Sequence, residues 1–135
     1  MTKTRKFRPA YAHELLSVAA GDLDSAQLLA VGQAKRKENI LFHCQQVVEK
    51  ALKAVLCARG IPVPLVHDLP IILDRFVDRQ VPFEEDVGDW GQFAAIRRYE
   101  EGVADLTEEE ITGALKIAAA ILSWAEVEVK TGVLG

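Results

Sequence analysis

Apolar residues recur at spacings of three and four over long stretches of this chain, and this periodicity constrains the fold more than any other feature. Between Pro9 and Val31 they form a single stripe, made up of Ala12, Leu15, Leu16, Ala19, Leu23, Ala26, Leu29 and Ala30. No stretch shows the sustained apolar–polar alternation of a half-buried strand. The sequence therefore predicts an all-α protein built from long amphipathic helices.

A second helix is predicted over residues 38–59, after a break at Gly32 and the basic triplet 35–37. Gly60 and Pro62 should end this helix. Glycine tolerates the left-handed conformation that closes many helices, and proline lacks the backbone N–H that a continuing helix needs.

Two shorter helices and one long helix are predicted in the second half of the chain. Asp68 or its neighbour should cap a helix whose apolar side is Ile71, Ile72, Leu73, Phe76 and Val77. A loop with Pro82, Glu84, Glu85 and Asp86 should follow, and then a short helix over about residues 89–99. Thr107 and Glu110 have the spacing of a capping box, so the final helix should run from there to about Lys130.

A length of 135 residues fits one domain, and a chain that is 50% hydrophobic and 27% charged can bury a core. Three long amphipathic helices with short connections favour antiparallel packing. We therefore expect a single domain over residues 1–135, an antiparallel up-and-down bundle of four to five helices. Residues 1–8 and 132–135 are expected to be flexible.

The charge balance argues against nucleic-acid binding through overall charge, because the net charge is −4 and the pI is about 5.4. Positive charge is concentrated locally, at Lys3, Arg5, Lys6 and Arg8, at residues 35–37 and at residues 97–98. Solvated ends and loops are the simplest interpretation of the first two clusters. No apolar run is long enough to span a bilayer, so a cytoplasmic protein without membrane contact is expected.

The second predicted helix carries the most informative side chains. Leu41, Cys44, Val48, Ala51, Leu52 and Val55 gather on one side of its helical wheel, and His43, Gln45, Gln46, Glu49, Lys50 and Lys53 occupy most of the other. Such a polar face can simply be solvated. Amides that donate and accept hydrogen bonds, together with lysines that meet phosphate, can equally hold a polar ligand.

Several segments resemble the HEPN domain family, named for higher eukaryotes and prokaryotes nucleotide-binding. They are the run from His43 to Leu56, then Gly60, the triplet His67-Asp68-Leu69, the pair Arg98-Tyr99 and residues 22–26 of the first helix. The resemblance implies an antiparallel helical bundle similar to the substrate-binding domain of kanamycin-type nucleotidyltransferases. It also implies a small, separately encoded nucleotidyltransferase as partner, a homodimer, and a role as a toxin–antitoxin component.

Ribonuclease members of this family carry an arginine followed, after four to six residues, by a histidine. Arg97 and Arg98 are not followed by a histidine at that spacing, and all three histidines of the chain lie upstream. The ribonuclease motif is therefore absent. The chain matches better the arginine–tyrosine form of members proposed to bind nucleotides, although Glu100 stands where that form often has proline.

Three hypotheses follow. The first is a binding subunit for a nucleotide or RNA, with a polar groove formed by Gln45, Gln46, Glu49, Lys50 and Lys53 and with Arg97, Arg98 and Tyr99 opposite. In this hypothesis the partner performs catalysis and this chain has no catalytic residues. The second is a divergent endoribonuclease toxin that uses Arg98 with Asp105 or His43. The third is a purely structural interaction or dimerisation module.

Other candidate sites have little support in the sequence. His67 and Asp68 are interpreted as packing and capping residues as readily as ligand contacts, and His43 is equally ambiguous. Metal-ligand spacings such as His-x-x-x-His and Cys-x-x-Cys are lacking, as is a glycine-rich phosphate loop, so neither a metal nor a cofactor is predicted. Cys44 and Cys57 lie too far apart on one helix to form a disulfide and should be buried free thiols.

Overall fold

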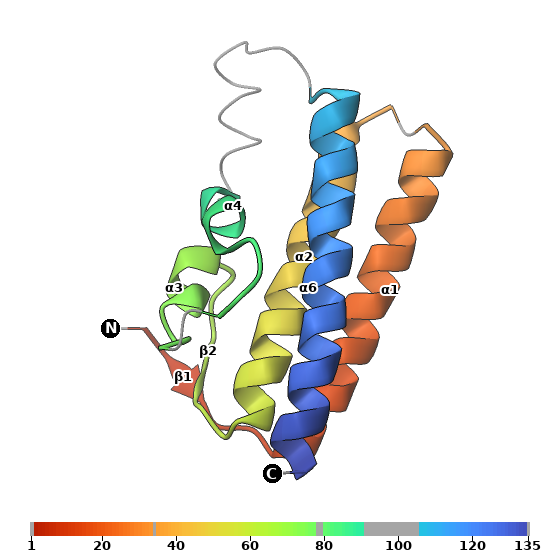
Figure 1. The fold of residues 1–135 in the computed structure, drawn as a ribbon. Helices are drawn as coiled ribbons and strands as arrows, with labels where there is room; N and C mark the ends of the chain where they lie inside the picture. The colour runs from red at the N-terminus through yellow and green to blue at the C-terminus, as the bar shows by residue number, and fades with distance from the viewer. Residues whose placement is uncertain (1, 34, 78–79, 91–105, 135) are drawn as a thin grey trace.

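The structure is a computed structural model that describes residues 2–33, 35–77, 80–90 and 106–134. Its elements are, in chain order, β1 (Thr4–Arg5), the 3₁₀ helix η1 (Pro9–Tyr11), α1 (Ala12–Val31), α2 (Lys37–Ala58), β2 (Val63–Pro64), α3 (Leu69–Leu73), α4 (Glu84–Asp89) and α6 (Glu108–Leu134). Figure 1 shows α1, α2 and α6 as long helices packed side by side, with α3 and α4 beside α2. The all-α helical bundle predicted from the sequence is confirmed.

The three long helices alternate only partly in direction. α1 runs antiparallel to α2, whereas α6 runs in the same direction as α2 (Figure 1). Contacts at both ends of α2 and α6 agree with this parallel arrangement. Lys37 Nζ lies 2.9 Å from Glu108 Oε1 where the two helices begin. Where they end, a Cβ on Gly132 would lie 3.3 Å from the Cβ of Ala58. α3 and α4, which lie between α2 and α6 in the sequence, carry the chain back toward the start of α2.

Local sequence signals explain where the helices begin and end. Gly60 has φ +74°, and the backbone N–H of Ile61 donates to the carbonyl of Leu56 at 2.9 Å, which is the Schellman closure of α2. Asp68 Oδ1 accepts a hydrogen bond from the Ile71 N–H at 3.2 Å, so it caps α3 as expected.

The predicted capping box of the last helix is also present. The Glu110 N–H donates to Thr107 Oγ1, and the Thr107 N–H donates to Glu110 Oε1, both at 3.1 Å. These reciprocal bonds satisfy two backbone donors at the start of α6, which carries three carboxylates in its first turn.

Four local expectations differ from the structure. Glu84, Glu85 and Asp86 do not lie in a loop but form the first turn of α4. Val77, expected on the apolar side of the third helix, is 92% exposed, because α3 already ends at Leu73. Strand β1 pairs antiparallel with β2, Thr4 opposite Pro64, in a region expected to be flexible. α6 continues to Leu134, beyond the predicted end at Lys130. Of the short helix expected over 89–99, only Asp89 and Trp90 lie within the described residues.

α2 is the central helix of the bundle. Its buried residues are Ile40, Cys44, Val47, Val48, Glu49, Ala51, Leu52, Ala54, Val55, Leu56, Cys57 and Ala58, which together occupy most of its circumference. α1, α6 and α3 pack around it and supply much of the remaining core. The polar face predicted for α2 is therefore largely enclosed by the fold, so the simple interpretation of that face as solvated is wrong for Glu49.

Both cysteines are buried free thiols, as predicted. Burial raises the pKa of Cys44 to about 12, so its thiol stays protonated and unreactive near neutral pH. The Cys57 thiol donates to the backbone carbonyl of Arg8 at 3.1 Å and thereby contacts the segment before η1. Among the described residues, none of the helices is long and apolar enough to cross a membrane.

Candidate anion-binding site on helix α2

Glu49 is the feature of α2 that most needs an explanation. It is only 1% exposed, and it is the single buried polar or charged residue among those the structure describes. A carboxylate removed from water costs several kcal/mol unless charged or hydrogen-bonding partners compensate it. Its neighbours must therefore supply that compensation.

Three side chains converge on the Glu49 carboxylate. Lys50 Nζ donates to Oε2 at 3.0 Å, and Lys53 Nζ donates to the same oxygen at 3.2 Å. His67, in the loop between β2 and α3, places Nδ1 2.9 Å from Oε1 and 3.1 Å from Oε2. Because a carboxylate only accepts, Nδ1 must carry the hydrogen in this contact, which directs the second ring nitrogen, Nε2, away from Glu49. We call these four residues the Glu49 cluster.

The electrostatics of the cluster favour an ionised carboxylate. Burial by itself raises the pKa of Glu49, but the hydrogen bond from Lys50, the charges of Lys53 and Lys50 and the hydrogen bond from His67 together outweigh it. The net result is a pKa below the ordinary glutamate value. Glu49 is therefore a fixed negative charge at neutral pH.

One positive charge remains when the cluster is counted with His67 neutral, since two lysines surround one carboxylate. The Lys50 side chain is 23% exposed and the Lys53 side chain 11%, so this excess charge is held close to the molecular surface. The His67 side chain is 63% exposed. The cluster therefore presents hydrogen-bond donors and a net positive charge to solvent over a buried counter-charge, an arrangement that suits a phosphate or carboxylate ligand.

A small depression adjoins the cluster. It is lined by Phe42, Gln45, Gln46, Glu49, His67, Leu69 and Trp90. Gln45 Nε2 donates to the backbone carbonyl of Trp90 at 3.3 Å, which ties α2 to the residue that follows α4. The depression thus combines the two predicted amides with two aromatic side chains.

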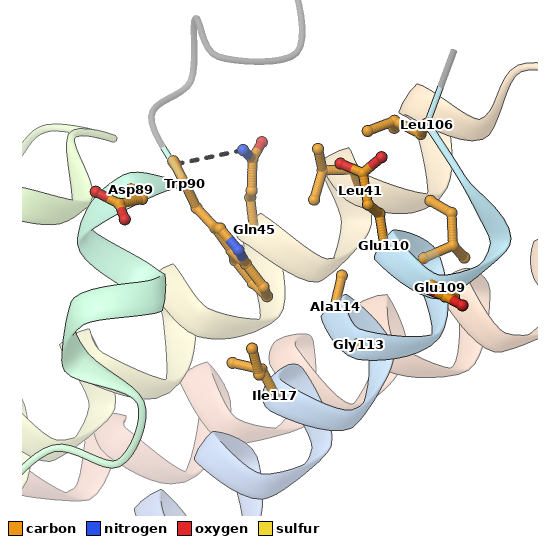
Figure 2. Close-up of a pocket in the computed structure, with 11 residues that line it drawn as sticks. Leu41, Gln45, Asp89, Trp90, Leu106, Glu109, Glu110, Gly113, Ala114 and Ile117 are labelled. Atoms are coloured by element: carbon orange, nitrogen blue, oxygen red, sulfur yellow. Dashed lines mark hydrogen bonds between the residues drawn. The ribbon is translucent and has the colours of Figure 1, made fainter. Parts of the chain in front are cut away.

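A second pocket lies on the other side of Gln45, between α2, the end of α4 and the first turns of α6. Figure 2 shows the Trp90 indole and the Gln45 side chain at its α4 edge, with Leu41, Ala114 and Ile117 across from them. Its lining is mainly apolar apart from Gln45, Asp89, Glu109 and Glu110. Gln45 and Trp90 line both hollows, so the two lie next to each other.

The structure brings together five of the residues predicted for the site. Gln45, Gln46 and Glu49 line the small depression, and Lys50 and Lys53 contact Glu49 from the same helix. His67 joins them from the loop before α3. Arg97, Arg98 and Tyr99, expected on the opposite side of the groove, lie outside the described residues.

His43 and Asp68 do not belong to the cluster. His43 Nδ1 lies 3.2 Å from Asp22 Oδ1, so this pair joins α2 to α1. Asp68 caps α3. Sequence reasoning missed Phe42 and Trp90 as lining residues, because an aromatic side chain on a helix packs into the core more often than it borders a ligand site.

Within the described part of the chain, no group of three or more His, Cys, Asp or Glu side chains could hold a metal ion. The Glu49 cluster itself has one carboxylate and one imidazole, and its two ammonium groups would repel a cation. Its ammonium groups and imidazole N–H suit an anion better than a cation.

Comparison with known proteins assigns the chain to a family. No curated protein and no solved structure gives a match to it. The HEPN domain matches residues 12–128, a range that contains the long helices α1 and α2, the loop bearing His67 and most of α6. This range covers most of the 135 residues, and it includes every member of the Glu49 cluster. The chain therefore belongs to the HEPN domain family.

Proposed function

We propose that this HEPN protein is a binding subunit that holds the phosphate of a nucleotide or nucleic acid at the Glu49 cluster, while a separately encoded small nucleotidyltransferase performs the chemistry. The observation that carries this proposal is the excess positive charge of the cluster. Lys50 and Lys53 share one buried carboxylate, so a second anion can approach the exposed side of Lys50 without leaving any charge unpaired.

The surroundings of the cluster suit the remainder of a nucleotide. The depression beside Glu49 is bordered by Phe42, which is 51% exposed, and by the partly buried Trp90. Aromatic faces stack on bases, and the amides of Gln45 and Gln46 can donate to and accept from base edges. Phosphate, base and aromatic surface would then lie along two turns of α2.

Isothermal titration calorimetry with ATP, GTP, CTP and UTP tests the site. Lys50→Met keeps the length of the side chain and removes its charge, and it should weaken nucleotide binding about tenfold, since a charge-assisted hydrogen bond contributes about 1.5–3 kcal/mol. Lys130→Met on the exposed face of α6 is the matched control and should bind like the wild type. Thermal melts of both variants verify that the fold persists.

A wild-type protein that binds none of these nucleotides would contradict the proposed site. In that case the cluster has a purely structural role, as a set of ion pairs that fastens the His67 loop to α2. One observation favours this second candidate, because each charged member of the cluster already has an intramolecular partner.

The partner half of the proposal is tested separately. We expect the affinity-tagged chain to co-purify from its native cells with a small nucleotidyltransferase, and to have twice its monomer mass by light scattering, as a homodimer. A toxin–antitoxin role would appear as growth arrest that depends on one component and is relieved by the other. Recovery of a lone monomer would contradict the two-component assembly.

A further inference from the structure

The amino-terminal segment of this protein is a short basic stretch. Residues 1–8 hold four of the 16 basic residues, Lys3, Arg5, Lys6 and Arg8, and none of the 20 acidic ones. The remaining 127 residues therefore carry a large excess of carboxylates. An acidic protein with one short basic segment can still bind a polyanion locally, because the screening length at physiological salt is only about 8 Å.

The basic segment has a defined position against the bundle. β1 pairs with β2, with Arg5 opposite Val63, and the Leu65 N–H donates to the Lys3 carbonyl at 2.8 Å. At its other end, the Arg8 carbonyl accepts from the buried Cys57 thiol. These are backbone contacts of the segment, so they do not occupy its cationic side chains.

The four cations are exposed, and within the described residues none of them forms an ion pair. This contrasts with Arg36, Lys37, Lys50, Lys53 and Arg59, which each contact a carboxylate. A segment whose cations have no internal counter-charge is available to an external anion.

Aromatic rings are interleaved with these cations. Phe7 and Tyr11 stack with their ring centroids 5.1 Å apart and their planes inclined by 14°, and the Arg5 guanidinium lies 5.0 Å from the Phe7 ring centroid. Tyr11 is 38% exposed. Alternating cations and stacked rings are the combination with which proteins bind single-stranded nucleic acid, the cations along the backbone and the rings against bases.

The basic segment also leads toward the Glu49 cluster. Lys3 is hydrogen-bonded to Leu65, and His67 follows two residues later in the chain. Two residues of chain span at most about 7 Å, so His67 lies within that distance of the residue bonded to Lys3. The Lys3 end of the basic segment is therefore close to the loop that carries His67.

We propose that residues 3–11, from β1 to the end of η1, form a binding surface for single-stranded nucleic acid that continues from the Glu49 cluster, so that an oligonucleotide binds more tightly than a mononucleotide. This inference rests on the proposed function and extends it. The Glu49 cluster holds one phosphate, the cations of residues 3–8 contact the phosphates that follow, and Tyr11 stacks on a base.

A duplex and a membrane surface fit these observations less well. The aromatic rings stack on each other and Phe7 packs against the core, so they do not form an apolar wedge for a bilayer. The segment is short, and the rest of the acidic protein would repel a wide polyanion. A narrow, flexible single strand makes local contacts without that penalty.

Fluorescence anisotropy with labelled 12-nucleotide single strands, one of RNA and one of DNA with the same sequence, tests the inference. The test variant combines Lys3→Gln, Arg5→Gln, Lys6→Gln and Arg8→Gln. The control variant has the same change in net charge, through Lys35→Gln, Arg75→Gln, Lys116→Gln and Lys130→Gln, all at exposed positions. Both variants should melt close to the wild type, because β1 is held by backbone bonds.

The test variant should bind the single strands at least tenfold more weakly at low salt, and the control should bind within twofold of the wild type. The dependence of log K on log salt should flatten by about 0.7 for each phosphate that the variant no longer neutralises. Tyr11→Leu should weaken binding several-fold with an unchanged salt slope, because it removes stacking and no charge. Equal binding of RNA and DNA would indicate backbone and stacking contacts alone, and a preference for RNA would add contacts to the 2′-hydroxyl.

Equal weakening in the test and control variants would overturn the inference, and so would the absence of any binding to single strands by the wild type. Binding to vesicles of mixed phosphatidylserine and phosphatidylcholine, with none to oligonucleotides, would assign the segment to a membrane surface instead. Failure of the proposed function would be recognised separately, because ATP binding would be absent or would not change in Lys50→Met. If only the present inference is wrong, Lys50→Met still weakens ATP binding.

Discussion

At the scale of single residues, Glu49 is the buried group on which the other side chains of the cluster converge. A buried carboxylate is tolerated here because two ammonium groups and an imidazole contact it. The same contacts hold Lys50 and His67 at the surface in fixed orientations. A ligand that binds them need not order them first, which reduces the entropic cost of binding.

Glu49→Gln should lower the free energy of unfolding by about 3 kcal/mol at pH 7, since it leaves the nearly buried Lys53 without its counter-charge. Urea denaturation measures the loss. Glu128→Gln is the control, because it breaks the more exposed pair with Arg59 and should cost less than about 1 kcal/mol. Equal costs for the two variants would show that the Glu49 cluster adds nothing to stability.

The stability difference between the wild type and Glu49→Gln should also depend on pH. The folded-state pKa of Glu49 lies below its ordinary value, so the unfolded chain binds the proton more readily. The stabilisation is therefore complete above the ordinary glutamate pKa of about 4.3, and is lost as pH falls through the lowered folded-state value. Urea melts at pH 5, 4 and 3 should show the difference shrinking as the pH falls. A difference that grows on acidification would contradict this assignment.

At the scale of the elements, the sequence predicted the long helices well, because their signals are local. The apolar period identifies α1, α2 and α6, and Gly60, Asp68 and the Thr107–Glu110 box mark ends that the structure confirms. Each of these signals acts within one helical turn, so no knowledge of the tertiary fold is needed to interpret it.

The short elements could not be predicted in the same way. β1 and β2 have two residues each, too few for a strand period, and they exist only because the fold brings Thr4 beside Pro64. α4 follows its N-cap residue Phe83, a non-glycine residue with φ +54° that no local rule anticipates. Its first turn holds three carboxylates, which suggested a solvated loop although acidic residues also favour a helix amino terminus.

The candidate site was predictable to the extent that it lies on one helix. Glu49, Lys50 and Lys53 are close in sequence, and positions i and i+4 face each other on a helix. The burial of Glu49 was not predictable, because it depends on α2 being enclosed by other elements. The contact with His67 depends on the loop after β2 folding back onto α2. The spacing of apolar residues in the sequence carries no information about that contact.

At the scale of the whole molecule, α2 is surrounded, and its neighbours are fastened to it by different means. α1 and α6 pack along its length, whereas the short helices α3 and α4 lie beside it (Figure 1). Arg59 joins three parts at the end of α2. Its Nη2 lies 2.9 Å from Glu128 Oε2 on α6, and its guanidinium lies 5.8 Å from the ring centroid of Phe76, which follows α3.

This arrangement predicts unequal local stability, which amide hydrogen exchange measures. Amides in the middle of α2, such as those of Val48 and Leu52, should exchange only through global unfolding, because their side chains are fully buried. The amides of Ile72 and Leu73 in α3 should exchange faster, through a local opening in which Phe76 leaves the bundle.

Arg59→Met removes the cation over Phe76 and keeps an apolar stem, so it should accelerate exchange in α3 more than in α2. Glu128→Gln leaves that cation in place and should not produce this difference. If α2 and α3 accelerated equally in Arg59→Met, the short helices would unfold with the bundle as one cooperative unit. The loop that presents His67 to Glu49 would then be as stable as the core.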